Sequence, residues 1–224
     1  FFFQADDGIR DSVASRGLGD VYKRQALEGS IFIAGAVVQW LRDSINIIDK
    51  ADQVGHLASK AKDQDIYFVP AFTGLGAPYW DSSARGAIFG LLRDTGREEI
   101  ALAALESIGF QTRDLLEAMI KDVEGMKRDH VKLRVDGGMT QSSLSMKILA
   151  NLTGVEINIP TIQESTAKGV AWLAGMRAGL YNQLEVFEKE WALKETFSPL
   201  ISANERDKKY KGWKEAVGKT GTST

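Results

Sequence analysis

The sequence predicts an α/β fold, and two alternating stretches that each precede helix signals carry the prediction. Residues 131–135 alternate apolar and polar side chains before two glycines, and residues 155–159 alternate again before Pro160. Alternation with a period of two indicates a strand with one face turned inward. A chain that runs strand, helix, strand, helix is typical of a parallel sheet covered by helices.

Capping residues define the two helices of this unit. The first helix should begin at Ser142 or Ser143, because serine is a preferred N-cap residue. It should end at Gly154, since glycine readily adopts the left-handed conformation that closes many helices. The second helix should cover residues 165–179, with Ser165 or Thr166 as its cap.

The preceding part of the chain predicts two further helices and one strand. Apolar and small residues recur at three- and four-residue steps over 31–48 and, most clearly, over 97–122. Residues 50–65 are polar and mixed, which indicates a short helix and a loop. Residues 66–69 are an apolar run, typical of a buried strand. Residues 70–80 hold two glycines and two prolines, so we expect a structured loop there.

The composition excludes several classes of protein. The 224 residues are 44% hydrophobic and 26% charged with a formal net charge of -2, which excludes a disordered chain and gives no electrostatic reason to expect a nucleic-acid partner. No run of 18 apolar residues occurs, so we expect no membrane-spanning helix. Cysteine is absent and only His56 and His130 are histidines, so neither a thiol nucleophile nor a multi-histidine metal site is expected.

The turn of Asp136, Gly137 and Gly138 is the strongest candidate for chemistry. It lies between a predicted strand and a predicted helix, and its glycines allow the backbone to approach a ligand without Cβ interference. The helix that follows offers free N–H groups and a positive dipole end, which suit phosphate or ribose oxygens. The alternative is a plain tight turn.

A second candidate is the pair Gly35 and Gln39, which share one face of a predicted helix. The glycine would let a flat group lie against the helix, and the glutamine could hydrogen-bond that group. Helix packing also explains the glycine. The loop 70–80 has either a functional or a structural role. Glu106 is either a functional acid or one partner of a salt bridge at the boundary of the core. We interpret His56 and His130 as surface residues.

Both ends of the chain receive separate interpretations. Residues 1–25 show no helix or strand period, and the stretches 4–11 and 15–25 resemble translated sequencing-adapter DNA. We therefore expect a non-native segment there and a protein fragment that starts at Ala26. The charged stretch after Pro199 indicates a solvated terminal helix, and residues 217–224 a disordered tail. Packing explains Gly169 and Gly175, and we expect Trp172 and Trp191 in the core.

Five stretches taken in order resemble the glycerol kinases of the sugar- and polyol-kinase family, namely 26–43, 70–95, 105–119, 134–144 and 164–180. The resemblance covers residues 26–216 and implies the actin-like ATPase (ribonuclease H-like) fold. It implies the C-terminal ATP-binding lobe, truncated at its N-terminal strands, with only the last strand of the opening meander left at about 27–32.

The resemblance also implies an ATP or ADP site. Gly35 and Gln39 match family residues that contact ADP, and Gly138, beside Gly137, matches the turn residue that contacts the nucleotide. The family usually has asparagine where this chain has Ser142. A hydroxyl is shorter than an amide, so this contact should be altered.

For the intact parent, the resemblance implies phosphorylation of glycerol by Mg²⁺-ATP to sn-glycerol 3-phosphate, in the cytoplasm, by a possible homo-oligomer. The family's phosphate hairpin, polyol-binding residues and catalytic aspartate all precede the segment that matches Ala26. We therefore expect no metal ligands, no catalysis and at best weak nucleotide binding from this chain alone. The alternatives are a related pentulose, hexulose or polyol kinase lobe, or a non-catalytic actin-like nucleotide-binding module.

Overall fold

The structure is a computed structural model that describes residues 2–3, 27–28, 30–62, 64–123, 125–162, 164–180 and 192–221. Within these ranges the α-helices are α1 (Gly35–Asp43), α2 (Gln53–Ala58), α3 (Arg97–Asp122), α4 (Ser143–Thr153), α5 (Ser165–Arg177) and α7 (Ala203–Thr220). The strands are β1 (Phe2–Phe3), β2 (Leu27–Glu28), β3 (Tyr67–Val69), β4 (Ala87–Phe89), β5 (Lys132–Arg134), β6 (Glu156–Pro160) and β7 (Leu193–Phe197). Two 3₁₀ turns cover Arg128–His130 and Gly138–Gln141.

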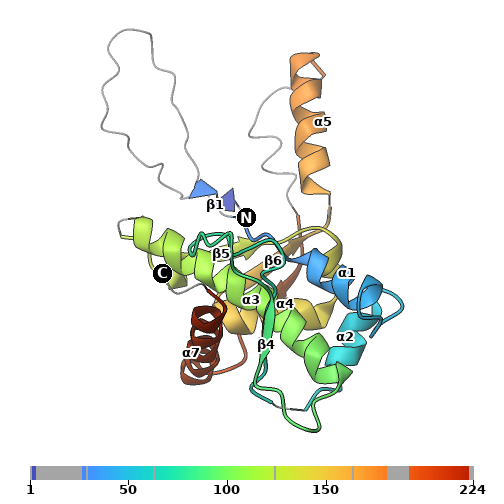
Figure 1. Cartoon of the computed structure of the whole chain (residues 1–224). Coiled ribbons are helices and arrows are strands. Elements are labelled where there is room, and N and C mark those ends of the chain that lie inside the picture. The colour runs from blue at the N-terminus through green and yellow to red at the C-terminus, as the bar shows by residue number, and fades with distance from the viewer. Residues whose placement is uncertain are drawn as a thin grey trace.

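The long helix α3 runs through the middle of the molecule (Figure 1). Its bounds confirm the helix predicted over 97–122. Most of its length is buried, and α1, α2, α4, β3 and α7 pack around it. Gly109 lets α4 approach, because a Cβ at this position would lie 2.9 Å from Leu152 Cδ1. The core is therefore built on α3.

The strands β5, β6 and β7 form one sheet in that order. The predicted parallel pairing is correct for β5 and β6. The sheet has a further strand that was not predicted, β7, which pairs antiparallel with β6. Four of the five β7 residues are exposed, so no buried alternation marked this strand in the sequence. A separate antiparallel pair, β3 and β4, lies against α3 and α7.

The caps of α4 confirm their predictions. The hydroxyl of Ser142 accepts a hydrogen bond of 3.2 Å from the backbone N–H of Ser145, and Gly154 ends the helix with φ +73°. For α5 the predicted cap is wrong. The N-cap residue is Glu164, which makes no side-chain capping bond, and the Ser165 N–H donates to Asp136 instead. A long-range partner has replaced a local cap.

The segment before α3 differs from its predictions. The helix predicted over 31–48 is shorter, because α1 begins only at Gly35, after a stretch held by a hydrogen bond from Gln111 to the Ile33 carbonyl. The strand expected over 27–32 is limited to β2, which pairs with β1. The two-residue strand β1 lies within residues 1–25, where no strand was predicted. Residues 4–26 lie outside the described ranges, and the foreign origin of residues 1–25 stays a prediction.

The last helix, α7, overturns two expectations. It extends to Thr220, so residues 217–220 are not a disordered tail; residues 222–224 lie outside the described ranges. Trp213 is fully buried, with Ala216 and Val217 beside it, so the helix is not simply solvated. Its apolar face packs on the same core as α3, and this tertiary contact outweighs the high local charge.

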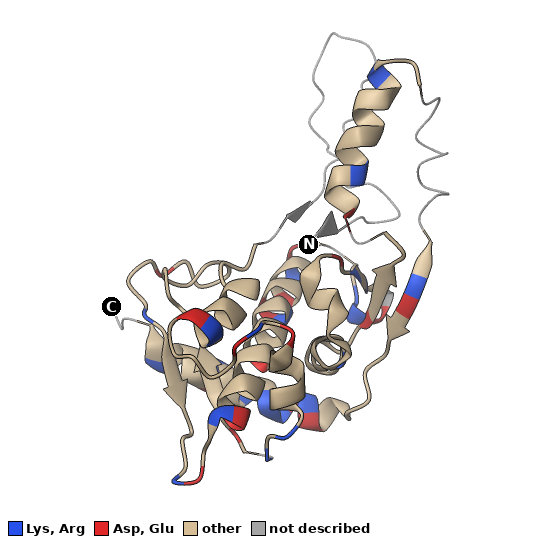
Figure 2. Cartoon of the chain, turned by 90° about the vertical axis from the view of Figure 1, so that its right-hand side faces the viewer, with Lys and Arg blue, Asp and Glu red and all other residues tan. Residues whose placement is uncertain are grey.

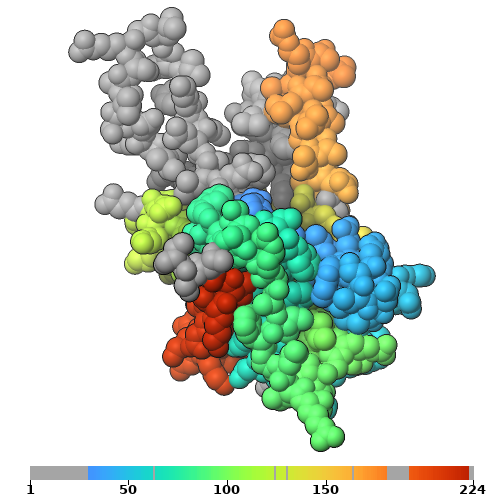
Figure 3. All heavy atoms as spheres, viewed as in Figure 1, coloured from blue at the N-terminus to red at the C-terminus, as the bar shows by residue number. Residues whose placement is uncertain are grey.

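The helix α5 extends away from the other described elements (Figures 1 and 3). It carries few charges (Figure 2), and Val170 and Leu173 are 64% and 59% exposed. A Cβ on Gly169 would meet no atom within 4 Å, so the expected close packing at Gly169 is wrong. Trp172 is buried as expected, whereas Trp191 lies outside the described residues. Within the described ranges, no helix has both the length and the apolar character of a membrane span.

Candidate functional site

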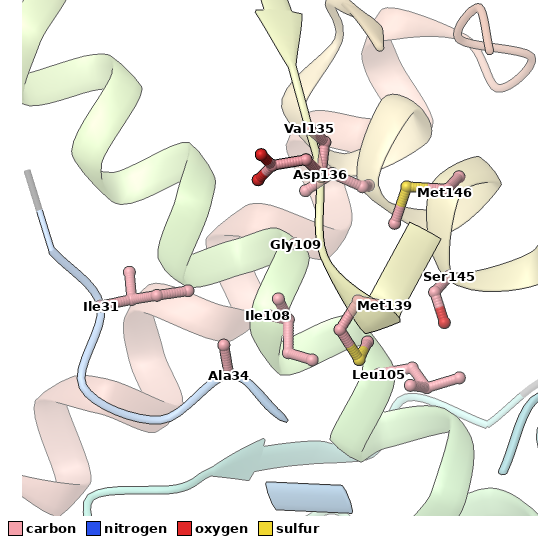
Figure 4. Close-up of a pocket in the computed structure, with 11 residues that line it drawn as sticks. Ile31, Ala34, Leu105, Ile108, Gly109, Val135, Asp136, Met139, Ser145 and Met146 are labelled. Carbon is pink, nitrogen blue, oxygen red and sulfur yellow. The ribbon is translucent and has the colours of Figure 1, made fainter. Parts of the chain in front are cut away.

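A hollow of about 160 Å³ lies between α3, the end of β5, the beginning of α4 and the segment before α1 (Figure 4). Apolar side chains form most of its wall, and Asp136 contributes a carboxylate. Its lining residues are Ile31, Ala34, Leu105, Ile108, Gly109, Val135, Asp136, Met139, Ser145, Met146 and Leu149. Such a lining suits the apolar part of a ligand, with polar groups at the rim.

Hydrogen bonds hold the turn after β5 at Val135 and at the first of its two glycines. The Val135 N–H donates to the Asn158 carbonyl over 3.0 Å. The Gly137 carbonyl accepts from the N–H and the hydroxyl of Thr140, over 3.1 and 2.7 Å. Gly137 has φ +85°, a conformation that favours glycine. A Cβ on Gly138 would meet no atom within 4 Å, so the backbone here is open to a ligand.

The first turn of α1 lies beside the same hollow. Ala34, the N-cap residue, lines the hollow and makes no side-chain capping bond. Gly35 and Gln39 are exposed, one helical turn apart, and a Cβ on Gly35 would meet no atom within 4 Å. The first N–H groups of an uncapped helix carry partial positive charge, which suits an anionic or polar group.

Ser142 is engaged within the protein. Its Oγ accepts hydrogen bonds from the N–H and the hydroxyl of Ser145, over 3.2 and 2.9 Å. It also lies against α2, because a Cβ on Gly55 would stand 2.8 Å from this oxygen. The hydroxyl thus serves as the cap of α4.

None of the five predicted site residues lines the hollow itself; their neighbours in the chain do. Ala34 precedes Gly35, Asp136 precedes Gly137, and Met139 follows Gly138. Sequence reasoning selected the glycines and missed the side chains of Asp136 and Met139, although both belong to the same turn. The aspartate of the motif was the signal that could have found them.

Other candidates have structural partners. The loop 70–80 does not line the hollow. Its residue Tyr79 accepts a hydrogen bond of 2.9 Å at its hydroxyl from the ammonium group of Lys214. Glu106 forms the boundary salt bridge that the sequence suggested, 3.3 Å from Lys209 Nζ. His56 is exposed. His130 closes a 3₁₀ turn, and its side chain lies outside the description.

The geometry of the hollow suits the binding of a small molecule. Within the described ranges, no three histidine or acidic side chains gather where they could hold a metal ion. The hollow provides an apolar wall, a glycine turn with open backbone and an uncapped helix start. Together these can hold a flat group and hydrogen-bond its polar edge.

Comparison with models of known protein families shows which family this chain belongs to. The description "FGGY family of carbohydrate kinases, C-terminal domain" matches residues 11–178. The chain belongs to the FGGY family of carbohydrate kinases. The match begins inside the segment 1–25 that we expect to be foreign. As an FGGY C-terminal domain, the chain has the expected actin-like ATPase fold.

Relatives of this FGGY chain share more than half of its aligned residues. It is 55% identical to a protein named glycerol kinase from Rhizobium rhizogenes and 53% identical to one from Roseobacter denitrificans, each over 196 residues. Each alignment covers 87% of this chain and 39% of the relative. A crystal structure of Plasmodium falciparum glycerol kinase with ADP superposes with a TM-score of 0.78 at 31% identity, covering 92% of this chain and 41% of that one. The chain thus spans about two fifths of these relatives.

Proposed function

We propose that this chain is the nucleotide-binding lobe of a glycerol kinase. In the reaction, a glycerol hydroxyl oxygen bonds to the γ-phosphorus of ATP while the bond to the bridging oxygen breaks. The products are sn-glycerol 3-phosphate and ADP, and the hydroxyl proton passes to a base. The base and the glycerol site would belong to the part of the longer relatives that this chain does not span, so the chain alone is inactive.

The observation that carries this proposal is the convergence of two predicted ligand-contacting segments on one hollow. The N-cap of α1 and the turn after β5 are separated by about a hundred residues, yet Ala34 and Asp136 line the same hollow. In the proposed complex, the base and ribose lie over Gly35, Gln39 and the hollow, and the phosphates lie near Gly138. Phosphoryl transfer depends on such positioning.

Mg²⁺ forms part of the proposal for the longer protein. The described residues do not assemble a site for it, because no three acidic or histidine side chains among them gather where they could hold a metal ion. The cation would therefore depend on the nucleotide's phosphates and on residues outside this chain. Cytoplasmic location and homo-oligomer formation are likewise expected of the longer protein.

Nucleotide binding by the chain tests the lobe assignment. Titration with ADP, followed by calorimetry, should show weak binding. Gly138→Val should weaken it at least about five-fold, because a branched side chain would occupy the open face of the turn. Gly218→Val is the matched control, since a Cβ there also meets no atom within 4 Å but lies on α7. Binding that is absent, or equal in both variants, would contradict the proposed site.

A chimera tests whether this chain can serve as the nucleotide lobe of a glycerol kinase. Residues 26–224 would be joined to the preceding part of the Roseobacter denitrificans relative, which would supply the glycerol site and the base, and ATP-dependent phosphorylation of glycerol would be measured. We expect turnover of glycerol. A folded chimera that binds ADP without turnover would favour a non-catalytic module.

A further inference from the structure

Asp136 makes a long-range contact from the candidate nucleotide turn. Its Oδ2 accepts a hydrogen bond of 3.2 Å from the backbone N–H of Ser165, which is 29 residues further along the chain. Ser165 is the first residue of α5. One side chain thus joins the turn after β5 to the beginning of α5.

The helix α5 depends on this contact for its cap. Its own N-cap residue, Glu164, makes no side-chain capping bond, and its first turn contains no acidic residue. The first N–H groups of a helix need acceptors from outside the helix, and a carboxylate is favourable at this positive end. Asp136 supplies that acceptor from the turn after the neighbouring strand, β5.

The same hydrogen bond also restrains the turn after β5. Two consecutive glycines follow Asp136, and glycine has more conformational freedom than any other residue. Hydrogen bonds hold Val135, which precedes Asp136, and the carbonyl of Gly137, the first glycine of the pair. The side chain of Asp136 is the third restraint, and it acts at the residue between these two.

We propose that Asp136 is a positioning residue for the nucleotide, which holds the turn of Gly137 and Gly138 in its binding conformation by capping α5. This role rests on the proposed function. The coupling also acts in the other direction. If the hydrogen bond between Asp136 and Ser165 strengthens nucleotide binding, bound nucleotide must stabilise that hydrogen bond, and with it the start of α5, by the same free energy. The helix α5, which extends away from the other described elements in Figure 1, is thereby coupled to the site.

Two variants remove the same hydrogen bond from opposite ends. Asp136→Ala removes the acceptor. Ser165→Pro removes the donor at the first helical position, where proline is tolerated. Asp136→Asn keeps an acceptor oxygen and removes the charge. If Asp136 positions the turn, Asp136→Ala and Ser165→Pro each weaken ADP binding by about five-fold, and the double variant weakens it no further. Asp136→Asn then keeps most of the wild-type affinity. If the charge only repels phosphate, Asn and Ala both tighten binding.

Hydrogen exchange gives a readout that does not depend on nucleotide. Asp136→Ala should speed exchange of the Ser165 amide in the free chain, whereas Asp52→Ala, at an exposed aspartate without a capping bond, should not. Saturating ADP should slow the same amide in the wild type. A wild type that fails to bind ADP overturns the proposed function and this role with it. A wild type that binds, with unchanged affinity in Asp136→Ala and Ser165→Pro, overturns the positioning role alone.

Discussion

Trp213 on α7 donates its indole N–H to the carboxylate of Asp114 on α3 over 2.7 Å. The Tyr210 hydroxyl donates to the other carboxylate oxygen, Oδ1, over 2.6 Å, and Lys214 Nζ lies 3.8 Å from the same oxygen. Asp114 is only 2% exposed, and its burial raises the pKa of the carboxyl although both hydrogen bonds oppose the shift. This buried charge fixes α7 to the core, so the carboxylate must keep its partners.

Replacement of Asp114 should therefore destabilise the chain. Asp114→Ala leaves the donors of Tyr210 and Trp213 without an acceptor and should lower the free energy of unfolding by about 3 kcal/mol. Asp114→Asn retains one acceptor and should cost about half as much. Urea unfolding measures both. Glu215→Ala, an exposed change on α7, should stay within about 0.5 kcal/mol of the wild type, and the same small effect at Asp114 would refute the argument.

Glu99 should make stability depend on pH. Its carboxylate accepts the N–H groups of Lys62 and Gly96, over 3.0 and 2.8 Å, and these bonds lower its pKa. A lowered pKa in the folded state stabilises the protein above the unfolded pKa, and this contribution is lost as the pH falls through the folded value. Glu99→Gln should be about 1 kcal/mol less stable near pH 7, and the difference should shrink below about pH 4.3.

The matched control for this measurement is Glu98→Gln in the same helical turn. Glu98 pairs with Arg97 at the surface, so its replacement should change the unfolding free energy little at any pH. Equal pH profiles for the two variants would show that the hydrogen bonds from Lys62 and Gly96 to Glu99 do not carry the effect.

Two glycines should respond in opposite directions to alanine. Gly154 has φ +73°, and a Cβ there would lie 2.7 Å from the guanidinium carbon of Arg206, so Gly154→Ala should cost about 2 kcal/mol. Gly218 lies inside α7 with open space around it, so Gly218→Ala should stabilise by about 0.5 kcal/mol. Thermal unfolding compares them. Arg206→Ala should relieve only the steric part of the Gly154→Ala cost.

The exposed apolar face of α5 should make the chain self-associate. Val170, Leu173, Met176 and Leu180 all lie exposed on or just after this helix. Large exposed apolar patches favour association, so the average mass in sedimentation should rise with concentration. Leu173→Glu should lower this rise, whereas Arg177→Gln, which changes an exposed charge, should not. A monomer at every concentration would contradict the expectation.

Local sequence signals located most elements near the site. The periodicity of α3, the alternation of β5 and β6, and the caps Ser142 and Gly154 depend on residues a few positions apart, so they could be read without a structure. The glycines of the candidate site were selected from the same kind of local signal. The side chain of Asp136 was missed because its partner, Ser165, is remote in sequence.

By itself, the sequence determined the α/β class, the long helix, the parallel pair of strands and the turn that offers open backbone, because steric rules and short periods specify them. The tertiary structure alone decided that Trp213 buries the charged terminal helix against Asp114, and that β7 joins the sheet antiparallel. It also decided that Asp136 caps α5. These features depend on desolvation and hydrogen bonding between residues far apart in the chain, for which no local pattern exists.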